Sequence, residues 1–155
     1  MRNRQKGFSL IELLIVVAII LIIAAIAIPN LLRSKIAANQ ASAVGSLRSL
    51  NTACIGYSTS YGQFPGTLAS LGPMAAGGTA SSTSADLIDS VLAAGSKSGY
   101  TFAFTPGAAN QSYTITATPI TVGTTGQNMY FTDQSGVIRV NTSGTGASAN
   151  STPIG

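Results

Sequence analysis

The sequence predicts an α+β protein in which one long N-terminal helix, apolar in its first half and amphipathic in its second, packs on a small antiparallel sheet. Three observations predict it. The first is an apolar run over residues 8–28 whose only polar side chains are Ser9 and Glu12. The second is the recurrence of apolar residues every three or four positions as far as Tyr57. The third is the alternation of apolar and polar residues beyond Tyr100, which is typical of strands.

The apolar run is long enough for a membrane helix, because about 20 residues in helical geometry span a hydrocarbon core of roughly 30 Å. Its one carboxylate, Glu12, would cost about 2.5 to 3.5 kcal/mol inside a bilayer. Glu12 can lie near the interface and lift its head group into water. Alternatively, a cut between Gly7 and Phe8 would create an ammonium on Phe8 of one subunit that neutralises Glu12 of its neighbour.

The run K-G-F-S-L-I-E over residues 6–12 resembles the type III leader of type IV pilins and of type II secretion pseudopilins. A short basic leader precedes it, and an unbroken apolar helix with Pro29 near its end follows. The resemblance is strong from Gln5 to Leu32 and covers only the general plan elsewhere. It implies that an inner-membrane prepilin peptidase cleaves after Gly7 and methylates the new amino terminus at Phe8.

The same resemblance implies that Glu12 aligns the subunits while an assembly ATPase and an inner-membrane platform extract them into a homo-oligomeric helical filament. The expected function is that of a structural subunit of a type IV pilus-like filament. The alternatives are a type II secretion pseudopilin, or a minor tip pilin that acts as a DNA- or surface-binding module. The expected layout is a cleaved leader (1–7), a transmembrane and filament-core helix (8–28), its amphipathic continuation (29–60) and a globular head (61–155).

The expected location is the inner membrane before assembly, as a single-pass protein with a cytoplasmic N-terminus, and an extracellular pilus or periplasmic pseudopilus afterwards. Three basic residues before the span and two shortly after it favour this orientation. An ordinary secretory cleavage site would also fit the Ala25-Ile26-Ala27 pattern. The apolar stretch, however, exceeds the roughly 7 to 15 residues usual for such a signal.

The second half of the helix carries an apolar stripe, and Pro29 should kink the helix where this half begins. Two alternatives are kept for Pro29 in a filament: a simple kink, or a local loss of helical structure around it. The stripe consists of Leu32, Ile36, Ala43, Leu47, Leu50, Cys54 and Tyr57. Polar residues expected on other faces are Arg33, Lys35, Asn39, Arg48 and Asn51.

The head is expected to begin with a loop over 61–73 that contains one helical turn at 67–71. A short helix over 85–94 follows, capped by Ser84, with Asp86 and Asp89 near its N-terminus and Gly95 as its stop. Those two carboxylates are interpreted as helix-capping residues in preference to calcium ligands. Strands are expected at 100–104, 113–118, 128–132 and 137–140, with a tight hairpin at 133–136 and a loose tail over 141–155. Together with the helix they would give a ladle-shaped molecule.

The composition argues against an enzyme, because the chain has no histidine and only four acidic residues, one of which lies in the apolar run. No cofactor or metal site is expected. Asp133 with backbone carbonyls would supply too few oxygen ligands for calcium, which takes about six to eight. The formal charge of +4 falls to about +1 without the leader, so no clear nucleic-acid site is expected. The single cysteine, Cys54, forbids an intramolecular disulfide and is expected in the core rather than in an intermolecular bridge. Glycosylation-acceptor matches at Asn110, Asn141 and Asn150 are expected by chance.

Overall fold

The computed structural model describes residues 7–154 and divides the chain into two units, residues 1–35 and 36–155. The first unit holds the N-terminal part of helix α1, which runs from Leu10 to Tyr61. Within this helix lies a segment that is long and apolar enough to cross a membrane, and none of its residues is buried. The long, apolar N-terminal helix is therefore confirmed. Pro29 lies inside it, and the helix continues without interruption through that residue, so the kink stays a prediction.

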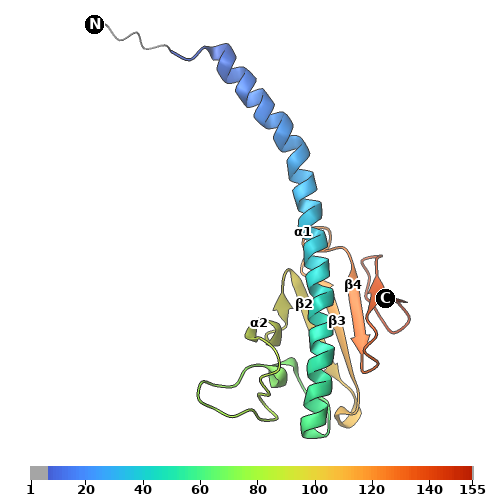
Figure 1. Ribbon diagram of the computed structural model, residues 1–155. Helices are drawn as coiled ribbons and strands as arrows, with labels where there is room; N and C mark the ends of the chain where they lie inside the picture. The colour runs from blue at the N-terminus through green and yellow to red at the C-terminus, as the bar shows by residue number, and fades with distance from the viewer. Residues whose placement is uncertain (1–6, 155) are drawn as a thin grey trace. The chain divides into compact units, whose positions relative to one another are not determined.

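The second unit is built on a six-stranded, fully antiparallel sheet in which each strand pairs with its neighbour in sequence, in the order β1-β2-β3-β4-β5-β6 (Figure 1). The strands are β1 (Ser96–Lys97), β2 (Tyr100–Pro106), β3 (Tyr113–Pro119), β4 (Met129–Asp133), β5 (Arg139–Asn141) and β6 (Thr152–Pro153). The α+β class, with the helix packed on a small antiparallel sheet, is confirmed.

The core lies between α1 and one face of the sheet. Five members of the predicted stripe are buried on α1: Ala43, Leu47, Leu50, Cys54 and Tyr57. Ser46, Asn51 and Ala53, which lie outside the stripe, are buried as well. On β3, Tyr113, Ile115 and Ala117 are buried, and the threonines between them are half-exposed. The alternation places one face of each strand against the helix, as a period of two requires.

Asn51 is a correction to the predicted helix faces, because it is buried. Its Nδ2 donates to Thr132 Oγ1 at 2.9 Å, and its Oδ1 accepts from the Tyr113 hydroxyl at 3.1 Å. Asn39, also expected on another face, is half-buried and donates to the backbone oxygen of Thr125 at 2.7 Å. Both amides are tolerated there because each finds a hydrogen-bond partner.

The predicted turn of helix at 67–71 is present as η1 (Leu68–Leu71), capped by Thr67. The predicted helix over 85–94 is wrong in its start, since α2 comprises only Ser90–Ala93 and is capped by Asp89 rather than Ser84. The physical reason is that residues 85–88 bond their backbone N–H groups to Ser70, Leu71 and Gly72, and Asp86 has a φ of 54° that no helix allows. The predicted stop at Gly95, with a φ of 78°, is correct.

The C-terminal region is more ordered than the loose tail expected over 141–155. Thr152–Pro153 forms β6 on the edge of β5. The Ile154 N–H donates to the Ile138 carbonyl at 2.8 Å, and the Arg139 guanidinium donates to the Ser151 carbonyl at 3.1 Å.

Two other elements are a short η2 (Ala108–Asn110) between β2 and β3 and the turn after β4. In that turn Gly136 has the predicted positive φ, but strand pairing resumes only at Arg139.

Candidate functional site

The N-terminal candidate residues lie at the start of α1, where they form a reciprocal helix cap. Ser9 precedes the first helical residue, and its hydroxyl accepts from the Ile11 N–H at 3.3 Å. The Glu12 carboxylate accepts from the Ser9 N–H at 2.9 Å. This pairing is a capping box, which satisfies two N–H groups that a helix start otherwise leaves without partners. The Ser-x-x-Glu spacing is the sequence signal that could have predicted it.

The cap holds the Glu12 carboxylate beside the residue that follows Phe8. A cut after Gly7 would therefore place the new ammonium of Phe8 one residue from the backbone nitrogen that Glu12 already binds. Gly7 and Phe8 are exposed, and no atom lies within 4 Å of where a side chain on Gly7 would begin. The peptide bond after Gly7 is thus open to a protease, although cleavage, methylation and the role of Glu12 in assembly stay predictions.

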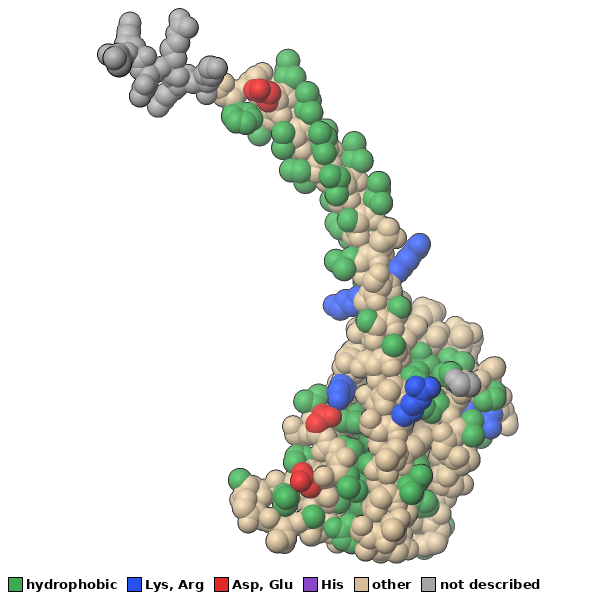
Figure 2. Space-filling view, in the orientation of Figure 1, with side chains coloured by type: hydrophobic (Ala, Val, Ile, Leu, Met, Phe, Trp, Pro, Cys, Tyr) green, Lys and Arg blue, Asp and Glu red, His purple; other side chains and the backbone are tan. Residues whose placement is uncertain are grey.

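The apolar surface around this cap is unusually extensive. Large hydrophobic side chains from Leu10 to Ile28 are between 46 and 73% exposed (Figure 2). Soluble monomers rarely expose continuous apolar patches beyond a few hundred Å². This segment therefore needs a covering of lipid or of other apolar helices. Either covering also excludes water from the neighbourhood of Glu12, which makes a counter-ion for the carboxylate more valuable.

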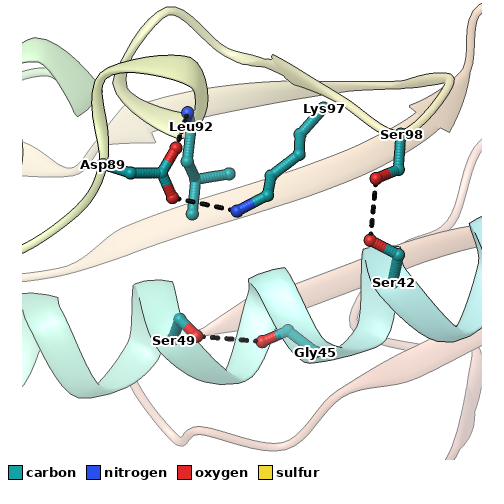
Figure 3. Close-up of polar contacts among 7 residues, drawn as sticks. All are labelled: Ser42, Gly45, Ser49, Asp89, Leu92, Lys97 and Ser98. Atoms are coloured by element: carbon teal, nitrogen blue, oxygen red, sulfur yellow. Dashed lines mark hydrogen bonds and ion pairs between the residues drawn. The ribbon is translucent and has the colours of Figure 1, made fainter.

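The second unit has a groove of about 520 Å³ between α1 and residues 87–97. Its polar groups already bind one another, as Figure 3 shows. The Asp89 carboxylate accepts from the Lys97 ammonium and from the Leu92 N–H, each at 2.9 Å. Ser42 donates to the Ser98 hydroxyl at 2.9 Å. The hydrogen bond from Lys97 is the main reason that the pKa of Asp89 is lowered, with a further contribution from the Leu92 N–H.

The buried titratable groups of the second unit are structural. Burial raises the pKa of the Cys54 thiol to about 12 and also raises the pKa of Tyr113. A nucleophile needs its deprotonated form near neutral pH, and burial disfavours that form here. Among residues 7–154 no group of three or more cysteine, aspartate or glutamate side chains is placed to hold a metal ion.

Comparison with known proteins points to the N-terminal segment. Residues 2–28 match a family model described as the prokaryotic N-terminal methylation motif. The chain is 54% identical over 50 residues to the type IV major pilin protein PilA of Myxococcus xanthus, a match that covers 32% of this chain and 23% of that pilin. It is 67% identical over 39 residues to the type IV wide pilus major component PilA4 of Thermus thermophilus, covering 25% of this chain and 29% of that protein.

A third relative is the type II secretion system core protein G of Pectobacterium carotovorum, which is 34% identical over 64 residues, 41% of each chain. The matched part of this chain thus spans between 23 and 41% of the length of these three relatives. No solved structure matched the chain.

Proposed function

Because the chain belongs, by its N-terminal segment, to the family of type IV pilins and type II secretion pseudopilins, we propose that it is a structural subunit of a type IV pilus-like filament. The observation that carries the proposal is the matched segment over residues 2–28, which ends in an apolar helix with one capping carboxylate. That segment combines a basic leader, a cleavable glycine and a helix that needs covering on all sides.

The proposed life history begins in the inner membrane, with residues 8–28 as a single-pass helix and the leader 1–7 in the cytoplasm. A prepilin peptidase removes the leader after Gly7 and methylates Phe8. The assembly ATPase and its membrane platform then move the subunit into a helical filament. The apolar helices of other subunits replace the lipid, so that extraction does not expose this surface to water.

Glu12 supplies the specificity of assembly in this proposal. Its carboxylate is oriented by the Ser9 N–H and has room for a second donor. The ammonium on Phe8 of a neighbouring subunit is the proposed donor. Within a dry filament core the pair would be strengthened by the low dielectric, while a wrong register would leave a buried charge without a partner.

The proposed role is structural rather than enzymatic, and the names of the relatives support it. The relatives are named as pilus, fimbrial or secretion-system components. The second unit contributes a packed core and a paired Asp89–Lys97 surface. The proposed layout therefore assigns residues 29–60 to the continuation of the helix and 61–155 to the head of a filament subunit.

The second candidate is a type II secretion pseudopilin that assembles into a periplasmic pseudopilus. One observation favours it: matches to type II secretion core proteins G cover 41 to 48% of this chain, compared with 25 to 36% for the pilus and fimbrial relatives. A minor tip pilin that binds DNA or a surface has less support, since Lys97 is already paired with Asp89. Electron microscopy of sheared surface filaments, with mass spectrometry of their bulk component, separates a pilus from a periplasmic pseudopilus and a tip protein.

The test of maturation is substitution of Gly7. Gly7→Leu should leave the full-length chain in the membrane, while the smaller change Gly7→Ala should retain at least partial processing. Mass spectrometry of the wild-type product should find Phe8 at the N-terminus with one added methyl group. A product beginning at Ile28, which is 20 residues shorter, would show that the secretory site after Ala27 is used instead.

A further inference from the structure

One flank of the second unit carries an apolar groove. It has a volume of about 500 Å³ and lies between α1 and the strands at the β6 edge of the sheet. We call it the flank groove. Its apolar lining includes Val44, Tyr130, Val140 and Ile154, and Arg48 lies at its rim. Arg48 is exposed, and the only ion pair among residues 7–154 joins Lys97 to Asp89, so the guanidinium has no intrachain carboxylate.

A short apolar ridge lies on the other side of α1 from the flank groove, in the segment that leads into α2. Leu87 of this ridge and Arg48 both line a second depression, of about 510 Å³, over α1. The ridge consists of Asp86, Leu87 and Val91. Leu87 is 43% exposed and Val91 is 54% exposed. The ridge is held by backbone hydrogen bonds from the Asp86 and Leu87 N–H groups to the carbonyls of Gly72 and Leu71. It is therefore a fixed feature of the surface, with a carboxylate that forms no intrachain ion pair in the described residues.

The ridge and the flank groove match in both polarity and charge. Two apolar side chains stand beside an acid on one flank, and an apolar depression stands beside a base on the other. A second exposed apolar pair, Ile120 and Val122, lies in the β3–β4 loop. Residues 119–128 contain no charged side chain, so that loop cannot match Arg48. The ridge is the better fit because it supplies a carboxylate as well as apolar side chains.

We propose that the 86–91 ridge of one subunit docks into the flank groove of a second copy of this chain, with Asp86 against Arg48. This inference rests on the proposed filament function and names its contact between heads. Because the ridge of one copy meets the groove of another, and these are different surfaces on different sides of α1, the contact is heterologous. A heterologous contact leaves a free ridge and a free groove at the two ends, so it propagates into an open helical array rather than a closed dimer.

Such a contact has a suitable strength for assembly. The apolar helix over residues 10–28 supplies much of the area to be buried, so the head contact itself can be small. The role of a small contact with one charge pair is to fix the register between neighbouring heads. The alternative is that the flank groove binds an unrelated protein. In that case the ridge and the flank groove would not contact each other in purified filaments.

Disulfide cross-linking in intact filaments tests the contact. Cells should produce two full-length chains together, one with Leu87→Cys and one with Val140→Cys. Mild oxidation of their filaments should give covalent dimers of the two chains. Leu87→Cys combined with Thr105→Cys is the matched control, since Thr105 is exposed at a position on β2 outside the groove, and it should stay uncross-linked. The native Cys54 is buried and does not compete.

Charge suppression is the second test. Arg48→Glu should lower filament yield about tenfold, because it places two carboxylates together. Adding Asp86→Asn should restore most of the yield, since asparagine keeps the left-handed backbone that Asp86 has at φ 54°. Adding Asp133→Asn instead should restore nothing. Retained membrane levels and processing would show that the variants fold.

The outcomes separate this inference from the proposed function. Filaments of the Leu87→Cys and Val140→Cys chains that form at wild-type yield but give no cross-link, together with no suppression of Arg48→Glu by Asp86→Asn, would overturn the docking contact and leave the filament function standing. A wild-type chain that never enters a filament would overturn both.

Discussion

Glu12 has two roles that substitutions can separate. Glu12→Gln keeps a side-chain oxygen that can accept from the Ser9 N–H, so the helix cap survives without the charge. Glu12→Leu removes both. We expect both variants to be cleaved after Gly7, and both to lose filaments, because the charge rather than the cap pairs with a neighbouring Phe8. Immunoblots of the processed form and microscopy of sheared filaments measure the two effects.

Ser9→Ala is the matched control for that experiment. It removes the hydroxyl that caps the Ile11 N–H, at a cost of about 1 kcal/mol to the helix start, and leaves the Glu12 charge in place. Filaments should therefore still form. Filaments at ordinary yield in Glu12→Gln would contradict the proposed ion pair and would leave the carboxylate as a cap alone.

Asn51 should be a large contributor to the stability of the second unit. Asn51→Ala leaves the Tyr113 hydroxyl and Thr132 without their partner in the core, and should cost about 2 kcal/mol or more. Thr132→Val removes only one of these bonds and should cost less. Urea unfolding of the detergent-solubilised chain, followed by near-ultraviolet circular dichroism of the tyrosines, measures both. Equal stabilities for wild type and Asn51→Ala would refute the role of the network.

At the scale of elements, periodicity was informative where packing reinforced it. The stripe from Ala43 to Tyr57 and the alternation in β2 and β3 each bury one face, and both were predictable. Asn51 was not, because an amide joins an apolar face only when partners distant in sequence, here Tyr113 and Thr132, are brought to it. The capping box of Ser9 and Glu12 was predictable from its spacing, but Glu12 was interpreted through its charge alone.

The elements predicted poorly depend on contacts that sequence does not reveal. The helix α2 was predicted to start at residue 85 but starts at Ser90, because residues 85–88 hydrogen-bond to the η1 region instead of forming a helical turn. β6 forms in a segment of small polar residues, since the exposed edge of β5 offers backbone hydrogen bonds that need no apolar side chain. Such partners lie far away in the chain, and local propensity carries no information about them.

The cap of α2 gives a prediction about pH. The pKa of Asp89 is lowered in the folded state, chiefly by the Lys97 hydrogen bond. A lowered folded pKa contributes stability above the unfolded value of about 3.9, and this contribution is lost as the pH falls through the folded pKa. Asp89→Asn keeps a capping oxygen and removes the charge. It should therefore be less stable than wild type at pH 6, and the difference should shrink as the pH falls below about 3.9 and through the lowered folded pKa.

Urea midpoints at several pH values measure this effect, and Lys97→Met is its control. That variant removes the first cause of the lowered pKa while Asp89 still caps Leu92. It should show a weaker dependence on acid pH than wild type. A difference between wild type and Asp89→Asn that stays constant from pH 6 to pH 3 would contradict the assignment. Because the pair is exposed, the difference should also shrink in high salt.

For the whole molecule, the two units obtain their stability from different sources. The second unit buries its own core between α1 and the sheet. The N-terminal part of α1 buries almost nothing and depends on lipid or on other subunits. The proposed passage from membrane to filament therefore changes the surroundings of one unit and can leave the fold of the other intact. That separation is physically useful, because the head can mature once and be carried through assembly.

The separation predicts that residues 36–155 fold alone and stay out of filaments. Cys54 is the probe, since it is buried and burial raises the pKa of its thiol to about 12. Because the thiolate is the reactive form, alkylation of the folded fragment at pH 8 should be slow and should become fast in urea. Sedimentation should show a monomer. A fragment whose Cys54 reacts equally fast with and without urea would show that the head needs the apolar helix to fold, and that the two units are not independent.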